Sequence, residues 1–195
     1  PESRVAEEIR AIRTTLESLF RQSVFAKLSA RRRRCEIFCI ANGCTDRTVE
    51  VAREVFERMA GEHPHAEMFS ARVVEIEEPG RSNAWNRFVH DFSAQGAKFI
   101  CLMDADIVFH ERDTLISLVE TLEVDTHAWV STGLHYKDIH FKQHRSLRDR
   151  LSLATSAMTG TIEGGFSGQL YCLRASVVRN IRLPRDLAAN DDGFL

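Results

Sequence analysis

Short apolar runs alternate with segments of helical periodicity, and this alternation constrains the fold more than any other feature of the chain. Three runs that end in polar or turn-forming residues predict strands over residues 35–41, 71–77 and 99–103. The segment after each run carries apolar residues three or four positions apart, which predicts a helix. Apolar strands separated by helices are typical of a parallel sheet with helices on both faces. The sequence therefore predicts an α/β fold with a mostly parallel central sheet.

Helices are also predicted around the first strand. Apolar residues recur at steps of three and four over residues 3–28, so we expect one helix there, with Ser3 as its N-cap. Thr45 is expected to cap the helix that follows the first strand.

After about residue 129 the regular alternation of apolar strands and helices ends. Residues 129–134 and 169–173 predict strands and residues 151–158 a helix, with a polar, His- and Arg-rich stretch between. The length of 195 residues is near the size of one domain, and no internal repeat is present, so we expect one domain over residues 1–195.

Composition limits the classes of partner. The 195 residues include 26 Lys and Arg against 28 Asp and Glu, a formal net charge of −2. This balance gives no overall field that recruits nucleic acid, so no nucleic-acid partner is expected. No apolar run approaches the roughly 20 residues that span a bilayer. An arginine run, residues 31–34, favours a solvated loop and leaves peripheral association with a membrane open.

The five cysteines favour a reducing compartment. They are odd in number and lie mostly within apolar runs, where Cys behaves as a small hydrophobic residue. Residues 1–4 have no apolar core, so they do not form a signal peptide. We therefore expect a cytoplasmic protein, at most at the inner face of a membrane.

Asp104 and Asp106 are the sharpest candidates for chemistry. They leave the end of an apolar strand, and in parallel sheets ligands bind beyond the carboxyl ends of the strands. Two carboxylates this close repel each other unless a cation lies beside them. Mg²⁺ or Mn²⁺, which prefer carboxylate and phosphate oxygens, fit best. The alternative is a loop whose acids only cap the next helix.

Two further features lie toward the C-terminus. Asp191 and Asp192 form a second acidic pair, which could supply a general base or a metal ligand, although an exposed turn explains it equally well. The glycine-rich segment 164–168 precedes an apolar run rather than a helix, so we reject a dinucleotide-binding loop. Its glycines would let the backbone approach a bulky ligand closely.

Five motifs follow one another along the chain. They are residues 36–48 (EIFCIANGCTDRT), 80–86 (GRSNAWN), 103–106 (MDAD), 164–168 (GGFSG) and 191–192 (DD). Their order resembles the family 2 glycosyltransferases. The resemblance implies a Rossmann-like GT-A fold and metal-dependent transfer of a sugar, with inversion, from a nucleotide-sugar donor to a carbohydrate, lipid or other hydroxyl acceptor. It also implies Mn²⁺ or Mg²⁺ as cofactor.

The resemblance implies roles for residues of the first two motifs. Asn42 and Asp46 match the loop that binds the nucleotide base, and Arg81 matches the basic position near base and ribose. Asn83 and Asn86 belong to the motif that follows Arg81 and are expected to bind the nucleotide sugar.

The later motifs receive metal-binding and catalytic roles. Asp106 matches the acidic residue that binds the metal on the diphosphate, and Asp104 reaches the ribose or the metal shell. Asp192 matches the catalytic base and Asp191 its partner. Gly165 joins the expected nucleotide-sugar-binding residues.

The sequence departs from the family pattern at several points. Ala41 stands where the family often has Asp, and Cys44 where it often has Ser, so the identity of the nucleotide base stays open. The resemblance favours uracil, and hence a UDP-sugar as donor. The opening strand of the family and its C-terminal acceptor motif have no counterpart, so the single domain is expected to lack both.

Two other functions stay open at this point. One is a haloacid-dehalogenase-like phosphatase with Asp104 as nucleophile, although that motif normally lies on the first strand and two strand–helix units precede Asp104 here. The other is a non-catalytic nucleotide-sugar-binding domain.

Overall fold

The computed structural model describes residues 2–133, 146 and 168–185. Its elements, in chain order, are α1 (Glu2–Phe20), α2 (Val24–Ala30), β1 (Cys35–Asn42), α3 (Thr48–Glu62), the 3₁₀ turn η1 (Ala66–Met68), β2 (Phe69–Ile76), α4 (Arg81–Arg87), the π turn η2 (Phe88–Phe92), β3 (Phe99–Met103), α5 (Thr114–Val124), β4 (Val130–Thr132), β5 (Leu170–Arg174) and α7 (Ala175–Val178).

The described strands form two groups. β1 and β2 pair in parallel, from Cys35 opposite Phe69 to Asn42 opposite Ile76. β3, β5 and β4 form an antiparallel sheet with β5 in the middle, so β3 and β4 are parallel to each other. The prediction of a mostly parallel sheet is therefore confirmed only in part. The connection from β3 through α5 to β4 leaves one strand position between them, and β5 fills it in the opposite direction.

The helix predicted over residues 3–28 is wrong in two respects. It begins at Glu2, so Ser3 lies within it and is not its N-cap, and it breaks around Gln22, between the end of α1 and the start of α2. The Gln22 side chain donates from Nε2 to the backbone oxygen of Glu111 (2.7 Å) and accepts at Oε1 from the backbone N–H of Leu115 (3.1 Å). These two bonds tie the chain to the loop before α5. The helical periodicity continues past the break, but the tertiary contacts divide it into α1 and α2.

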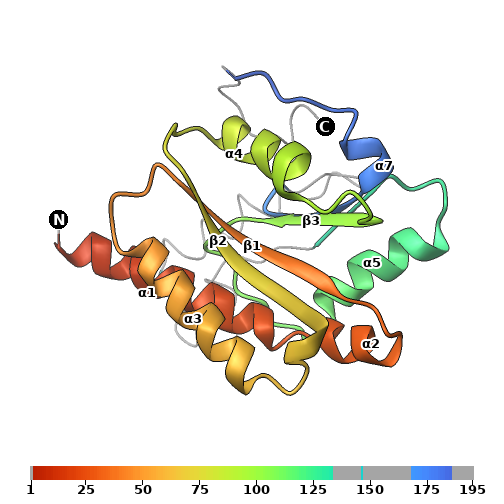
Figure 1. Ribbon diagram of the computed structural model, residues 1–195, viewed down its shortest axis with the longest axis horizontal. Coiled ribbons are helices and arrows are strands. Elements are labelled where there is room, and N and C mark those ends of the chain that lie inside the picture. The colour runs from red at the N-terminus through yellow and green to blue at the C-terminus, as the bar shows by residue number, and fades with distance from the viewer. Residues whose placement is uncertain (1, 134–145, 147–167, 186–195) are drawn as a thin grey trace.

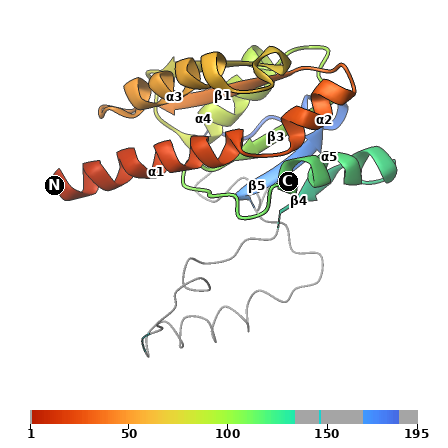
Figure 2. The same ribbon diagram turned by 90° about the horizontal axis from the view of Figure 1, so that it is seen from below.

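Two apolar clusters lie on opposite faces of the strands. α1, α2, α3 and α5 contribute to the first, and α4, η2 and α7 to the second. Residues of β5 alternate between them, with Leu170 and Cys172 in the first cluster and Tyr171 and Leu173 in the second, as the two-residue period of a strand requires. Figure 1 shows α4 and α7 above the strands and α1, α3, α2 and α5 below. Figure 2, which views the molecule from below, shows α1 running across this face toward α2. The prediction of helices on both faces is confirmed.

Part of the arginine run, residues 31–34, is paired with acidic residues of α5. Arg31 forms ion pairs with Glu120 (2.5 Å) and Glu123 (3.0 Å), and Arg33 lies 3.6 Å from Glu123. Acidic residues of α5 thus neutralise part of this positive charge. In the part of the chain that the structure describes, no helix is both long and apolar enough to cross a membrane.

Candidate functional site

The loops after β2 and β3 meet at one edge of the fold. Arg81, the first residue of α4, donates from Nη2 to Oδ1 of Asp104, which directly follows β3 (2.9 Å). Asn42 ends β1 opposite Ile76, the last residue of β2. The structure thus gathers Asn42, Arg81 and Asp104 near the carboxyl ends of three strands, where α/β proteins bind ligands.

The contact between Arg81 and Asp104 also involves the segment before β5. Arg81 Nη2 lies 3.4 Å from the backbone oxygen of Gly168, and the backbone N–H of Asp104 donates to the oxygen of Gln169 (2.9 Å). The side chains of Arg81 and Asp104 are 46% and 34% exposed. Ion pairs with such exposure stabilise a fold by only about 0–1 kcal/mol. The pair therefore acts mainly by fixing the positions of three loops relative to one another.

Asp106 lies on an exposed turn two residues beyond Asp104. The backbone N–H of Ile107 reaches back to the oxygen of Asp104 (3.4 Å), which closes the turn. Within the described residues, the Asp106 carboxylate makes no hydrogen bond or ion pair, and no group of three or more potential metal-ligating side chains occurs. Mg²⁺ and Mn²⁺ commonly take one or two carboxylates and complete their shell with water and substrate phosphates. The two carboxylates therefore fit such an ion.

The turn after β1 is closed tightly. Gly43 has a φ of +65°, and its N–H donates to the oxygen of Ile76 (2.9 Å). A Cβ at Gly43 would lie 2.9 Å from Cβ of Pro79, so a larger residue would collide with the turn after β2. This packing holds the tip of β1 against the loop that leads to Arg81.

Asn42, just before this turn, carries an unsatisfied acceptor. Its side-chain oxygen is buried and has no hydrogen-bond partner in the part of the chain that the structure describes. Leaving such an atom unpaired costs about 1–3 kcal/mol. A donor group of a ligand at this edge would satisfy it.

Asp46 lies just before the start of α3. Its Oδ1 accepts from the backbone N–H of Thr48 (3.0 Å), and hydrogen bonding from the Thr48 side chain and backbone holds the pKa of Asp46 below its usual value. The prediction that Thr45 caps this helix is wrong, because α3 begins at Thr48 and its N-cap residue is Arg47. Asp46 therefore has a structural role at the start of α3, beside the base-binding loop implied by the motif.

The two asparagines after Arg81 contact the protein backbone. Asn83 donates from Nδ2 to the oxygen of Glu78 (2.9 Å). Asn86 donates from Nδ2 to the oxygen of Leu183 (2.8 Å) and accepts at Oδ1 from the N–H of Leu183 (2.9 Å). Both ends of the Asn86 amide thus tie α4 to the segment after α7.

Several predicted residues fall outside the described part of the chain. They are Gly165, Asp191 and Asp192, together with the predicted helix over residues 151–158.

Sequence reasoning missed two groups at this edge. One is the backbone oxygen of Gly168, which contacts Arg81. The other is Tyr171, whose buried hydroxyl accepts from Trp85 Nε1 (3.0 Å) and links β5 to α4. The one sequence signal for Tyr171 was its position within an apolar strand. A tyrosine buried there needs a hydrogen-bond partner for its hydroxyl group.

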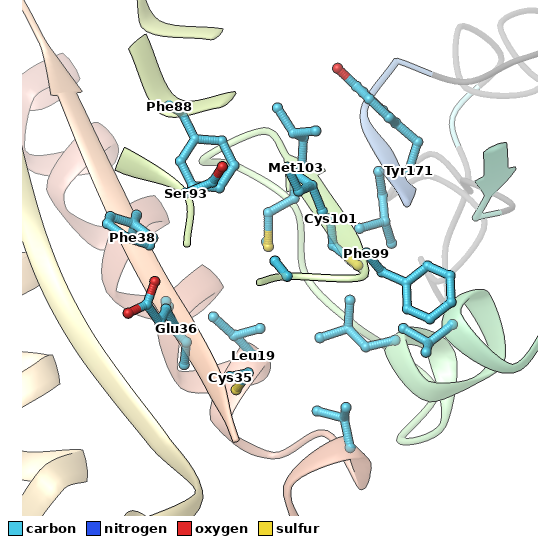
Figure 3. A pocket seen from close by; sticks show the side chains of 18 of the residues that line it. Leu19, Cys35, Glu36, Phe38, Phe88, Ser93, Phe99, Cys101, Met103 and Tyr171 are labelled. Carbon is cyan, nitrogen blue, oxygen red and sulfur yellow. The ribbon is translucent and has the colours of Figure 1, made fainter. Parts of the chain in front are cut away.

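A cleft of about 1260 Å³ opens between β1 and β3 and reaches this edge. Arg81, Asp104, Ala105 and Gly168 line its polar end. Figure 3 shows its deeper part, with Phe38 of β1 on one side and Cys101 and Met103 of β3 on the other.

Comparison of the chain with protein-family models gives a match to a known class. The family described as Glycosyl transferase family 2 matches residues 6–181, which include every strand from β1 to β5. The chain belongs to glycosyl transferase family 2. Membership makes it a glycosyltransferase and decides against the phosphatase alternative. No curated protein matches the chain.

Proposed function

We propose that this family 2 glycosyltransferase moves a sugar from a UDP-sugar to an acceptor hydroxyl with inversion at the anomeric carbon. The observation that carries the proposal is the Arg81–Asp104 contact at the carboxyl ends of the strands. A nucleotide diphosphate presents phosphate charge and ribose hydroxyls. Arg81 offers a fixed positive charge and planar donors, and Asp104 offers acceptor oxygens. The pair therefore complements both parts of the ligand.

Asp106 is the proposed metal ligand, with Asp104 directed to the ribose or to the metal shell. Asp106 is exposed beside the polar end of the cleft, so its oxygens face solvent. When bound, Mn²⁺ or Mg²⁺ would neutralise the charge that develops on the leaving diphosphate.

The unsatisfied oxygen of Asn42 supports a nucleobase site at the tip of β1. A uracil ring carries one N–H, and this donor suits a buried amide oxygen. Asp46, Asn83, Asn86 and Gly165 remain proposed nucleotide-sugar contacts on the motif resemblance. Because both polar atoms of Asn86 bind Leu183, we expect Asn86 to support the site rather than to touch the nucleotide.

Asp192 is the proposed general base and Asp191 its partner. In the reaction, the acceptor oxygen bonds to the anomeric carbon while the bond from that carbon to the diphosphate oxygen breaks. Asp192 takes the proton of the acceptor hydroxyl. The acceptor is a carbohydrate, a lipid or another hydroxyl compound. A cytoplasmic location, at most at the inner face of a membrane, agrees with five free cysteines.

UDP binding measured by calorimetry tests the donor site. Asp106→Asn should weaken binding about tenfold in Mn²⁺ and little in EDTA, since one unit of ligand charge is lost. Asp125→Asn, on an exposed residue just after α5, is the matched control. Equal affinity of Asp106→Asn and the parent in Mn²⁺ would overturn the metal role.

A second pair of variants tests Arg81. Arg58 forms a similar partly exposed ion pair with Glu17 (2.6 Å), distant from the motifs. We expect Arg81→Ala to lower UDP affinity by about tenfold and Arg58→Ala to leave it unchanged. The same small change in both variants would make Arg81 an ordinary surface cation.

Measurement of turnover distinguishes sugar transfer from binding of the nucleotide alone. Asp192→Asn should lower sugar transfer by roughly 10²–10⁴-fold with little change in UDP affinity, and Asp191→Asn should cost less. The assay supplies UDP-sugars and Mn²⁺ to the full-length protein with candidate acceptors. Metal-dependent UDP binding without sugar transfer or donor hydrolysis would instead support the non-catalytic alternative.

A further inference from the structure

Two cysteines of the antiparallel sheet lie directly opposite each other. Cys101 of β3 and Cys172 of β5 are register partners, and their Sγ atoms are 2.8 Å apart. A disulfide bond is about 2.05 Å long, so the two sulfur atoms need to approach each other by less than about 1 Å to form one. Both cysteines are free thiols in the structure. The two thiols of the reduced chain are therefore already in contact.

The hydrogen bonds of the sheet show what kind of strand pair this is. The backbone N–H of Asp104 donates to the oxygen of Gln169, the residue opposite it (2.9 Å). Hydrogen-bonded and non-hydrogen-bonded pairs alternate along an antiparallel ladder. Three positions back from Asp104, Cys101 and Cys172 therefore form a non-hydrogen-bonded pair. Such pairs have Cα atoms about 4.5 Å apart, within the range of about 4.4–6.8 Å that a disulfide spans.

The two thiols differ in how far solvent reaches them. Cys101 is exposed on the β3 wall of the cleft (Figure 3), whereas Cys172 is completely buried in the first apolar cluster. The hydrogen bond with Cys101, together with burial, raises the pKa of Cys172, which therefore stays a protonated thiol at neutral pH. A dissolved oxidant thus meets Cys101 first, and Cys172 is the neighbour that can react with the product.

The other three cysteines are less suited to form a disulfide. Cys35 and Cys39 both belong to β1, and burial is the main cause that raises the pKa of each to about 11. Thiolates are the reactive form of cysteine, so both are slow to react at neutral pH. Cys44 is exposed. All five cysteines lie in the described part of the chain, and there only Cys101 and Cys172 form a hydrogen bond between sulfur atoms.

We propose that Cys101 and Cys172 are a modification site, at which hydrogen peroxide forms a reversible disulfide that fastens β3 to β5. The Cys101 sulfur first takes an oxygen atom from the peroxide, which gives a sulfenic acid and releases one water. The Cys172 sulfur then bonds to the Cys101 sulfur while the bond from that sulfur to oxygen breaks. The proton of the Cys172 thiol leaves with the hydroxyl group as a second water. The two thiols lose two electrons, which reduce the peroxide.

The position of the pair links it to the Arg81–Asp104 contact. Asp104 directly follows β3, and its N–H bonds to Gln169 just before β5. The disulfide lies three residues from each of these two residues, so it holds together the two strands that position Asp104. A dithiol reductant reverses the bond by exchange. Disulfides in reducing compartments are mostly transient or redox-sensing, and a reversible bond of this kind is compatible with the cytoplasmic location proposed above.

Mapping of the cysteines by mass spectrometry provides the first test. The folded chain is treated with hydrogen peroxide, the remaining thiols are blocked with N-ethylmaleimide in denaturant, and the peptides are analysed without reduction. We expect a linked pair of peptides that contains Cys101 and Cys172, and dithiothreitol should restore both thiols. In Cys101→Ser the buried Cys172 should be oxidised more slowly, on the order of tenfold. Cys44→Ser is the control, and should form the linked pair as the parent does.

Three results of this experiment would contradict the proposal. The first is oxidation of Cys44 in the parent while Cys172 stays a thiol. The second is a linkage of Cys101 to Cys35, whose charge interacts with that of Cys101, instead of to Cys172. The third is equal oxidation of Cys172 in Cys101→Ser and in the parent, which would show that Cys101 is not the entry point.

Amide hydrogen exchange followed by NMR provides the second test. Leu102 and Asp104 belong to hydrogen-bonded pairs of the ladder, so their N–H groups point toward β5. Oxidation of the parent should slow exchange of both amides on the order of tenfold, because the disulfide opposes local separation of β3 from β5. The same peroxide treatment of Cys101→Ser should change neither amide. Unchanged exchange in the oxidised parent would exclude the fastening of β3 to β5.

Discussion

β5 and β1 are both apolar strands, yet they are buried to very different degrees. β5 has neighbours on both edges, and its residues from Leu170 to Leu173 are all buried, Cys172 completely. β1 has β2 on one edge and the cleft on the other, and Ala41 is its one buried residue. Similar hydrophobicity thus gives different burial, because a strand is covered by its edge neighbours as well as by the helices on its faces.

Truncations in the two strands should show the largest difference. Leu173→Ala in β5 should lower the free energy of unfolding by about 2–5 kcal/mol, because a buried side chain is replaced by a cavity. Ile37→Ala in β1 should cost about 1–2 kcal/mol, since Ile37 is already partly exposed. Urea denaturation of both variants measures the difference. Equal losses would mean that the open edge of β1 does not weaken its packing.

Loss of the hydrogen bonds that join α4 to the segment after α7 should have an intermediate effect on stability. Asn86→Ala removes two hydrogen bonds between α4 and Leu183, and should lower the free energy of unfolding by about 1–3 kcal/mol. Asn83→Ala removes a single, exposed hydrogen bond to Glu78 and serves as the control, at about 0.5–1 kcal/mol. Urea denaturation and UDP calorimetry separate the roles. Loss of UDP affinity at unchanged stability would show that Asn86 binds the nucleotide directly.

Loss of a charge at the start of α3, the helix that follows β1, should have the smallest effect. The pKa of Asp46 is lowered in the folded chain, so its stabilising effect is present above the ordinary carboxyl pKa near 4 and is lost as pH falls through the folded-state pKa. Asp46→Asn keeps an acceptor oxygen but removes the charge. It should cost about 0.3–1 kcal/mol at pH 7 and less at about pH 2.5, where more of the carboxyl group is protonated. Thermal unfolding at both pH values tests this, and an equal loss at both would exclude the charge as its cause.

Local pattern predicted some elements of the fold accurately. The strand over residues 99–103 matches β3, because a short apolar run bounded by polar residues depends only on neighbouring positions. The break at Gln22 and the reversed direction of β5 depend on contacts with residues far away in the chain. Periodicity carries no information about such contacts.

The candidate site was predictable to a similar extent. The position of Asp104 after an apolar strand placed it at the carboxyl edge of the sheet, and the structure agrees. Its contact with Arg81 joins residues 23 positions apart, and only strand packing brings them together. The reciprocal hydrogen bonds of Asn86 likewise required the folded path of the segment after α7.

Among the described strands, β1 and β3 each have one unpaired edge, and these edges also affect how separate molecules behave. An unpaired strand edge is a template for any other strand, so β1 of one copy is available to β3 of another. Charged side chains at strand edges oppose such pairing, and Arg34 and Glu36 stand near the amino end of β1. The middle of the strand, from Ile37 to Ile40, has no charged side chain. Self-association of the protein is therefore tied to the accessibility of these two edges.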